Sequence, residues 1–186
     1  MGIGDMDLGF GRTRRQICYH EAGHAVFYYH ANLKINFVHV PGEGNVCAEW
    51  PNHPHPEQAI DLAASCVAAW YTEARGRGET FPHMSFEDFM AYAEAERADM
   101  QFAPLGLVSD SAEALDMLEL AASRYANPQD KMSECYKAMC DTVDRNLEFW
   151  WPEIEALAKR VFVADDGYLE GNEVAGIIEA ARGEGS

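Results

Sequence analysis

Residues 20–24 read His-Glu-Ala-Gly-His, and this pattern constrains the fold more than any other feature of the 186-residue chain. Two histidines four positions apart lie on one face of a helix, about one turn from each other. They can then bind one zinc ion together, and Glu21 stands where its carboxylate reaches a water on that ion. The pattern therefore predicts a helical zinc site with His20 and His24 as ligands and Glu21 as general base.

The same five residues also fit an ordinary buried helix without a metal. Ile17 and the run 25–29 make the segment apolar enough for a core element. Unpaired polar groups are costly inside a protein, so two histidines and a glutamate in such a helix need partners. A metal ion supplies these partners, and we therefore prefer zinc binding to the metal-free alternative.

Composition and charge narrow the classes of partner. The net charge of −17 argues against nucleic acid and against an anionic membrane surface, since both require neutralising cations. No apolar run approaches the roughly 20 residues that span a bilayer, and residues 1–11 lack a signal pattern and are expected to be flexible. We therefore expect a cytoplasmic protein with reduced, mostly packed thiols at its five cysteines: Cys18, Cys47, Cys66, Cys135 and Cys140.

The periodicity of the chain predicts a mainly helical α+β domain over residues 12–186, with one small β-hairpin next to the zinc-site helix. Strands are expected at 35–40 and 45–50, because apolar and polar residues alternate there between turn signals. Capping and breaking residues delimit the helices. The expected helices are 13–31, 57–76, 85–102, 109–126, 128–151, a restart at Pro152 that ends near Val163, and 171–181.

A catalytic zinc usually has three protein ligands, so a third must be found. His30 has the spacing of the longer motif H-E-x-x-H-x-x-G-x-x-H, but Phe27 occupies the glycine position at which that helix must stop. If the helix continues, His30 lies about 9 Å along the axis from His24 and points away from it. The third ligand is therefore expected later in the chain.

Several stretches resemble the peptidase domain of the FtsH-type zinc proteases. The closest is the H-E-A-G-H-A segment, and weaker similarity covers the following strand with its Pro-x-Gly turn, a later helix, and a terminal helix of the type L-x-G-x-E. These stretches are residues 17–26, 37–42, 68–74 and 166–174. The resemblance implies a helical, zincin-like peptidase fold, although the double glycine that the family carries in the later helix is absent here.

The resemblance also implies the identity of the third ligand. In that family it is an aspartate at the start of a helix, in an N-D-x-x-x-A-T context, and Ser109-Asp110 followed by Ala114 fits this best. Asp116 is the alternative, and a helix N-cap is the structural role that Asp110 could have instead. Residues 77–104 would be an insertion, and Glu73 is a candidate to orient a ligand histidine.

The expected function is that of a zinc-dependent endopeptidase acting on peptides or unfolded proteins. The chain contains no phosphate-loop motif, whereas FtsH-type proteases carry membrane helices and an AAA+ ATPase. We therefore expect an ATP-independent enzyme, or one that depends on a separate ATPase partner or on homo-oligomerisation. The alternative is a zinc-stabilised binding or regulatory protein that retains the fold without proteolysis.

Overall fold

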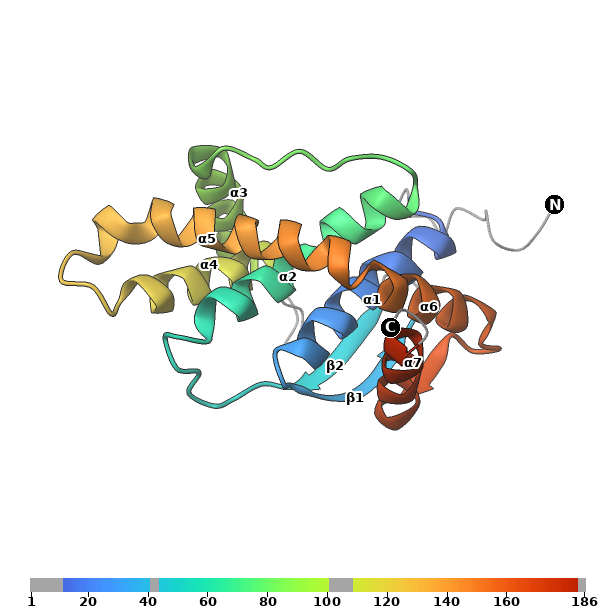
Figure 1. The fold of residues 1–186 in the computed structure, drawn as a ribbon. Coiled ribbons are helices and arrows are strands. Elements are labelled where there is room, and N and C mark those ends of the chain that lie inside the picture. Colours follow the sequence, from blue (N-terminus) through green and yellow to red (C-terminus); the bar gives the residue numbers. More distant parts are fainter. Residues whose placement is uncertain (1–11, 41–43, 101–108, 184–186) are drawn as a thin grey trace. The chain divides into compact units, whose positions relative to one another are not determined.

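The computed structural model describes residues 12–40, 44–100 and 109–183, and the expected flexibility of residues 1–11 lies outside this part. The described part is mainly helical, as predicted, with seven helices and three strands. It divides into two compact units, and Figure 1 shows their helices and strands. Of the described residues, the first contains 12–40, 44–51, 68–81 and 146–183, and the second contains 52–67, 82–100 and 109–145.

The first unit is built around α1 (Arg14–His30) and a small sheet. Thr13 caps α1 because its hydroxyl accepts the Gln16 backbone N–H, while the Gln16 side chain accepts the Thr13 backbone N–H. The twelve residues from Ile17 to Tyr28 are all buried, so α1 is covered on every side. The predicted helix is confirmed, and it ends where Asn32 adopts a left-handed backbone conformation with φ of 61°.

The sheet has the strand order β2-β1-β3, and both pairings are antiparallel. β1 (Lys34–His39) and β2 (Asn45–Glu49) form the predicted hairpin. The expectation of a lone hairpin is wrong, because β3 (Tyr168–Glu170) adds a third strand along the other edge of β1. Three residues are too few for a visible alternation, and the strand is held in register by the turn at Gly167 (φ 69°), whose carbonyl accepts the Val40 N–H.

The remaining elements of the first unit are the end of α2 (Ala59–Gly76), α6 (Trp151–Val163) and α7 (Gly171–Gly183). α6 packs against α1, and α7 packs against α6 and β1. A Cβ on Gly171 would collide with the Ile35 carbonyl, which shows how closely α7 begins against β1. The core of this unit is apolar and includes Val26, Val38, Ile154, Leu157, Leu169 and Ile178.

The second unit is helical and contains the start of α2, α3 (Phe86–Met100), α4 (Asp110–Ala122) and most of α5 (Pro128–Phe149). Ser85 caps α3 by accepting the Asp88 backbone N–H, as predicted. The Tyr136 ring packs against Phe89 and its hydroxyl donates to the Met84 carbonyl, so α5 is joined to the chain before α3. The buried side chains of this unit include Leu62, Phe89, Leu115, Leu118 and Met139.

Two further predictions concern the helix break before Pro152 and the state of the cysteines. The long helical stretch breaks before Pro152, as predicted, since α5 ends at Phe149 and α6 restarts at Trp151. All five cysteines are free, and four of them are buried, which matches packed thiols without disulfides. Among the described helices, none combines the length and the apolar character that crossing a membrane requires.

Candidate metal centre

One face of α1 carries a row of rings at a spacing of four residues. The rings of His20 and His24 are 5.0 Å apart between centroids and meet edge-to-face, at 83°. The His24 ring stacks on Tyr28 at 5.6 Å, and Tyr28 in turn meets the edge of Trp50. Both histidines are buried, so the helix places two imidazoles side by side where bulk water is excluded. This is the local geometry that the His-Glu-Ala-Gly-His pattern predicts.

Asp110 is the first residue of α4, directly after the N-cap residue Ser109. The Ser109 side chain does not cap the helix, and its hydroxyl lies 2.9 Å from that of Ser111. Asp110 therefore does not have the N-cap position that would explain it structurally. Asp110 lies in the second unit and the two histidines lie in the first, and its joining them at one metal ion is part of the proposed function.

The alternative third ligands have other partners. Asp116 is exposed, and its Oδ1 lies 2.6 Å from Nη2 of Arg97. His30 lies at the end of α1, where its Nε2 is 2.5 Å from Oε2 of the buried Glu153 and its ring stacks on Trp150 at 3.9 Å. Both residues are therefore engaged in contacts that a metal ligand would have to give up. The other four histidines lie outside α1: His39, His53, His55 and His83.

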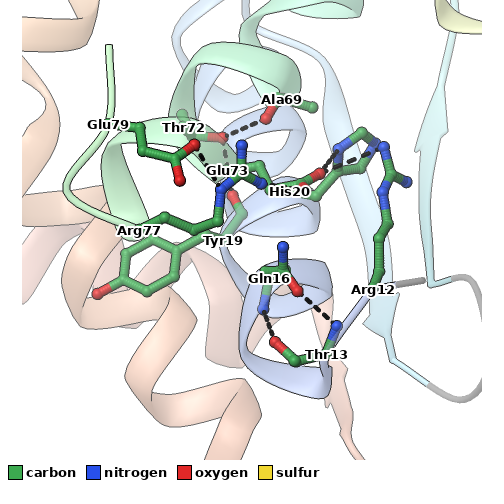
Figure 2. A network of polar contacts seen from close by, with 10 residues as sticks. All are labelled: Arg12, Thr13, Gln16, Tyr19, His20, Ala69, Thr72, Glu73, Arg77 and Glu79. Atoms are coloured by element: carbon green, nitrogen blue, oxygen red, sulfur yellow. Dashed lines mark hydrogen bonds and ion pairs between the residues drawn. The ribbon is translucent and has the colours of Figure 1, made fainter. Parts of the chain in front are cut away.

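Glu73 lies at the centre of a polar network behind His20 (Figure 2). Its Oε2 is 3.3 Å from Nδ1 of His20 and 3.2 Å from Arg12, and its Oε1 accepts a hydrogen bond of 2.7 Å from Arg77. The side chain is buried, although it stands near the end of a helix, where a glutamate is usually exposed to solvent. A carboxylate at the second nitrogen of a ligand histidine fixes the tautomer and the ring orientation, which leaves the other nitrogen for a metal.

The charges around Glu73 keep it ionised. Burial by itself raises the pKa of a carboxyl group, but the contact with His20 and the positive charges of Arg12 and Arg77 outweigh that effect. The net result is a Glu73 pKa below its ordinary value. Glu73 is therefore a carboxylate at neutral pH and can accept a proton from the His20 ring.

Two tight contacts join α1 to the end of α2 beside this network. The Thr72 hydroxyl lies 2.8 Å from the Tyr19 carbonyl and 2.9 Å from that of Ala69, so it can donate to either oxygen. A Cβ on Gly23 would collide with the Thr72 side chain and would crowd Ala69. Gly23, between Glu21 and His24, thus lets the two helices approach closely enough for Glu73 to reach His20.

Glu21 is buried, and the chain entering β2 lies directly against it. A Cβ on Gly44 would collide with the Glu21 carboxylate and with Ile17, and Gly44 has a left-handed φ of 84°. Only glycine adopts this conformation without strain and without a side chain in the way. The backbone at Gly44 therefore forms one wall of the space in front of Glu21.

The donor set suits zinc by its chemistry. Two imidazole nitrogens, joined by the carboxylate oxygen of the expected ligand Asp110, would leave a fourth position of a tetrahedral ion open, which is the arrangement of catalytic rather than structural zinc. Both histidines are buried, and His20 has the Glu73 carboxylate behind it. The residues present therefore fit the metal that the sequence pattern predicts.

Known proteins give no further support for an assignment. No protein-family model matches the chain, and no curated protein matches it. The sequence indicated His20, Glu21, His24 and Glu73 as site residues, but the contacts of Arg12 and Arg77 with Glu73 were not predicted. The contact of Arg77 with Glu73 could have been predicted, because Arg77 follows Glu73 by four residues, which is the spacing of a helical ion pair.

Proposed function

We propose that the protein is a zinc-dependent endopeptidase that hydrolyses peptides or unfolded proteins. In this proposal His20, His24 and Asp110 bind the metal and Glu21 is the general base. The observation that carries it is the buried face of α1, where two adjacent imidazoles and a glutamate lie in one turn, with Glu73 behind His20. A helix that is covered on every side has little reason to contain these three polar residues unless they act on a common partner.

The chemistry follows from the roles of these groups. When bound, zinc would lower the pKa of a water to about 7 and would polarise the carbonyl of the bond to be cut. The Glu21 carboxylate accepts the proton that the attacking water loses, and it returns this proton to the leaving amine. Glu73 holds the His20 ring in one orientation during these steps. The reaction consumes only water, so the chemical step itself needs no ATP.

We also propose the substrate, the compartment and the partners of the enzyme. An extended peptide or an unfolded chain is the expected substrate, and nucleic acid is disfavoured by the net charge of −17. The free cysteines favour a reducing compartment such as the cytoplasm. A separate ATPase or further copies of the chain are the partners that would deliver folded substrates.

A second function is favoured by one observation. Gly44 lies so close to Glu21 that the carboxylate has a backbone wall directly against it. A wall that did not move would exclude a substrate carbonyl from Glu21. The protein would then be a zinc-stabilised binding or regulatory protein that retains the fold without proteolysis.

Hydrolysis of unfolded casein separates the two functions. We expect zinc-loaded wild type to cut casein without added nucleotide, and we expect Glu21→Gln to lose about 10²- to 10⁴-fold in rate, the usual contribution of general base catalysis. Both proteins should retain zinc, because ligation is unchanged. The matched control is Glu94→Gln on the exposed face of α3, which removes the same charge and should cut at the wild-type rate.

Each outcome has a clear meaning. Equal rates for wild type and Glu21→Gln would refute the general-base role. No cutting by either protein, with zinc retained in both, would favour the binding function.

A further inference from the structure

A pocket of about 520 Å³ opens beside the N-terminal part of α1, in the same unit as His20 and His24. Two arginines line it, Arg15 from α1 and Arg77 just after α2. The N-cap residue of α1 and two residues of the helix contribute a hydroxyl, an amide and a phenol ring: Thr13, Gln16 and Tyr19. Figure 2 shows four of these residues, Thr13, Gln16, Tyr19 and Arg77, next to the network of His20 and Glu73. None of the pocket residues is a proposed zinc ligand or the proposed general base.

The wall formed by Tyr19 is rigid. Its ring stacks on Trp151 with centroids 5.7 Å apart and planes only 7° from parallel. A Cβ on Gly76 would also collide with the ring, so the backbone of α2 lies directly against it. These contacts hold the Tyr19 ring in place as one wall of the pocket, and an ordered wall lowers the entropic cost of binding a ligand.

The two arginines differ in how they are neutralised. Arg77 donates to Glu73 and to Glu79, which balances its charge but uses only two of the five N–H donors of a guanidinium. Arg15 is exposed, and its guanidinium lies 5.8 Å from the centre of the Tyr19 ring. Within the described residues Arg15 forms no ion pair. As far as the described part of the chain extends, the pocket thus contains a cation without an ion pair, in a protein whose net charge is −17.

An anion is the ligand that fits these groups. A guanidinium presents parallel donors that match the two oxygens of a carboxylate, and Thr13 and Gln16 add neutral polar groups at the pocket wall. A single unneutralised cation balances a monoanion. A phosphate dianion would need a second one, in a field that is negative overall. The pocket therefore matches a carboxylate better than a phosphate.

We propose that this pocket binds a carboxylate of the peptide substrate, so that the protein selects peptides with an acidic group. The claim that the ligand is a substrate rests on the proposed endopeptidase function. The claim that the pocket binds a carboxylate does not. The pocket is connected to the zinc site through covalent neighbours and one ion pair. Tyr19 directly precedes His20, and Arg77 holds the carboxylate of Glu73 that contacts His20.

Binding is tested by calorimetry in the Glu21→Gln background, so that no peptide is cut. The probe is an unstructured ten-residue peptide with one glutamate, compared with the same peptide carrying glutamine in its place. Each peptide is made with a free and with an amidated C-terminus. This arm distinguishes a side-chain carboxylate from a terminal one.

We expect a peptide with a carboxylate to bind about tenfold more tightly than the amidated glutamine peptide, as expected for one charge-assisted contact. Arg15→Gln should abolish this difference. Arg15→Lys keeps the positive charge but lacks the paired N–H donors of a guanidinium, so it should retain part of the difference. The matched control is Arg160→Gln, which removes an exposed arginine of the same unit outside the pocket and should leave binding unchanged.

Equal binding of all four peptides would overturn the proposal. An equal loss in Arg15→Gln and Arg160→Gln would also overturn it, because the effect would then be one of net charge alone. If the acidic peptide binds but casein is never cut, the endopeptidase function fails and the carboxylate pocket stands.

Discussion

Two helices of the first unit, α1 and α7, differ in how they are buried. α1 is covered along twelve consecutive residues that include two histidines and a glutamate, whereas α7 buries only Val174 and Ile178. The two buried positions of α7 are four residues apart, the ordinary pattern of a helix that lies on a core with one face. In α7 a polar residue is solvated, but in α1 each polar residue needs a partner within the protein.

The glycines of the two helices differ in the same way. Gly23 in α1 has no room for a Cβ because Thr72 and Ala69 fill the space, whereas Gly176 in α7 has nothing within 4 Å of that position. One glycine is therefore required by packing, and the other only lowers helix propensity. Identical substitutions at the two positions should have effects of opposite sign.

The largest effect is expected for Gly23→Ala. The added methyl group collides with the Thr72 side chain, and overpacking of this kind costs about 1–3 kcal/mol. We expect the free energy of unfolding to fall by that amount and zinc retention to fall with it, because α2 carries Glu73. Urea denaturation measures the first and metal analysis the second. A variant as stable as wild type would show that α1 and α2 are not packed this closely.

A second test compares two cysteines of the first unit. Burial raises the pKa of the Cys18 thiol on α1 from 9.0 to about 11, and the neighbouring Glu21 adds to this, while Arg14 acts in the opposite direction. The thiolate is the reactive form, so at pH 8 Cys18 should react with iodoacetamide about a hundredfold more slowly in the native than in the denatured protein. Its rate should rise with pH toward 11. Mass spectrometry should show that Cys47, which is only partly buried, reacts first.

The third prediction concerns Glu73 and its contact with His20. Glu73→Gln removes the carboxylate while keeping the shape, and loss of such a partner usually lowers metal affinity about 10- to 100-fold. Competition with a zinc chelator measures the change. Glu79→Gln is the control, because it removes an exposed partner of Arg77 and leaves Glu73 in place. Equal zinc affinity in the two variants would mean that Glu73 does not position His20.

The smallest effect is expected for Gly176→Ala. The methyl group meets no atoms, and alanine favours a helix over glycine by about 0.5–1 kcal/mol. The variant should therefore be more stable than wild type by that amount in the urea denaturation used for Gly23→Ala. A loss of stability would mean that α7 has a covering partner on this side.

Much of the fold was predictable because its signals are local. Caps such as Thr13 and Ser85 and the break before Pro152 depend on neighbouring residues, and they delimit α1, α3 and α6 as expected. β3 was missed because three residues give no periodicity, and its pairing with β1 depends on contacts more than a hundred residues apart. The short length of β3 and its long-range pairing, rather than the composition of the chain, made this strand unpredictable from sequence.

The candidate site likewise contains residues with a local signal and residues whose roles depend on distant segments. His20, Glu21 and His24 were identified from a motif, since their spacing on one helix is fixed by geometry. The roles of Arg12 and Gly44 were not predictable, because each depends on how distant segments meet the helix. Gly44 lies against Glu21 only after the hairpin has folded back on α1.

The zinc content of purified protein tests the central claim most directly. We expect about one zinc per chain in wild type, and much less in His24→Ala and in Asp110→Asn, because each loses a ligand. Asp116→Asn should retain zinc, since it removes only an exposed partner of Arg97. Wild type that binds no zinc, or a loss of zinc in Asp116→Asn but not in Asp110→Asn, would contradict the proposed metal centre.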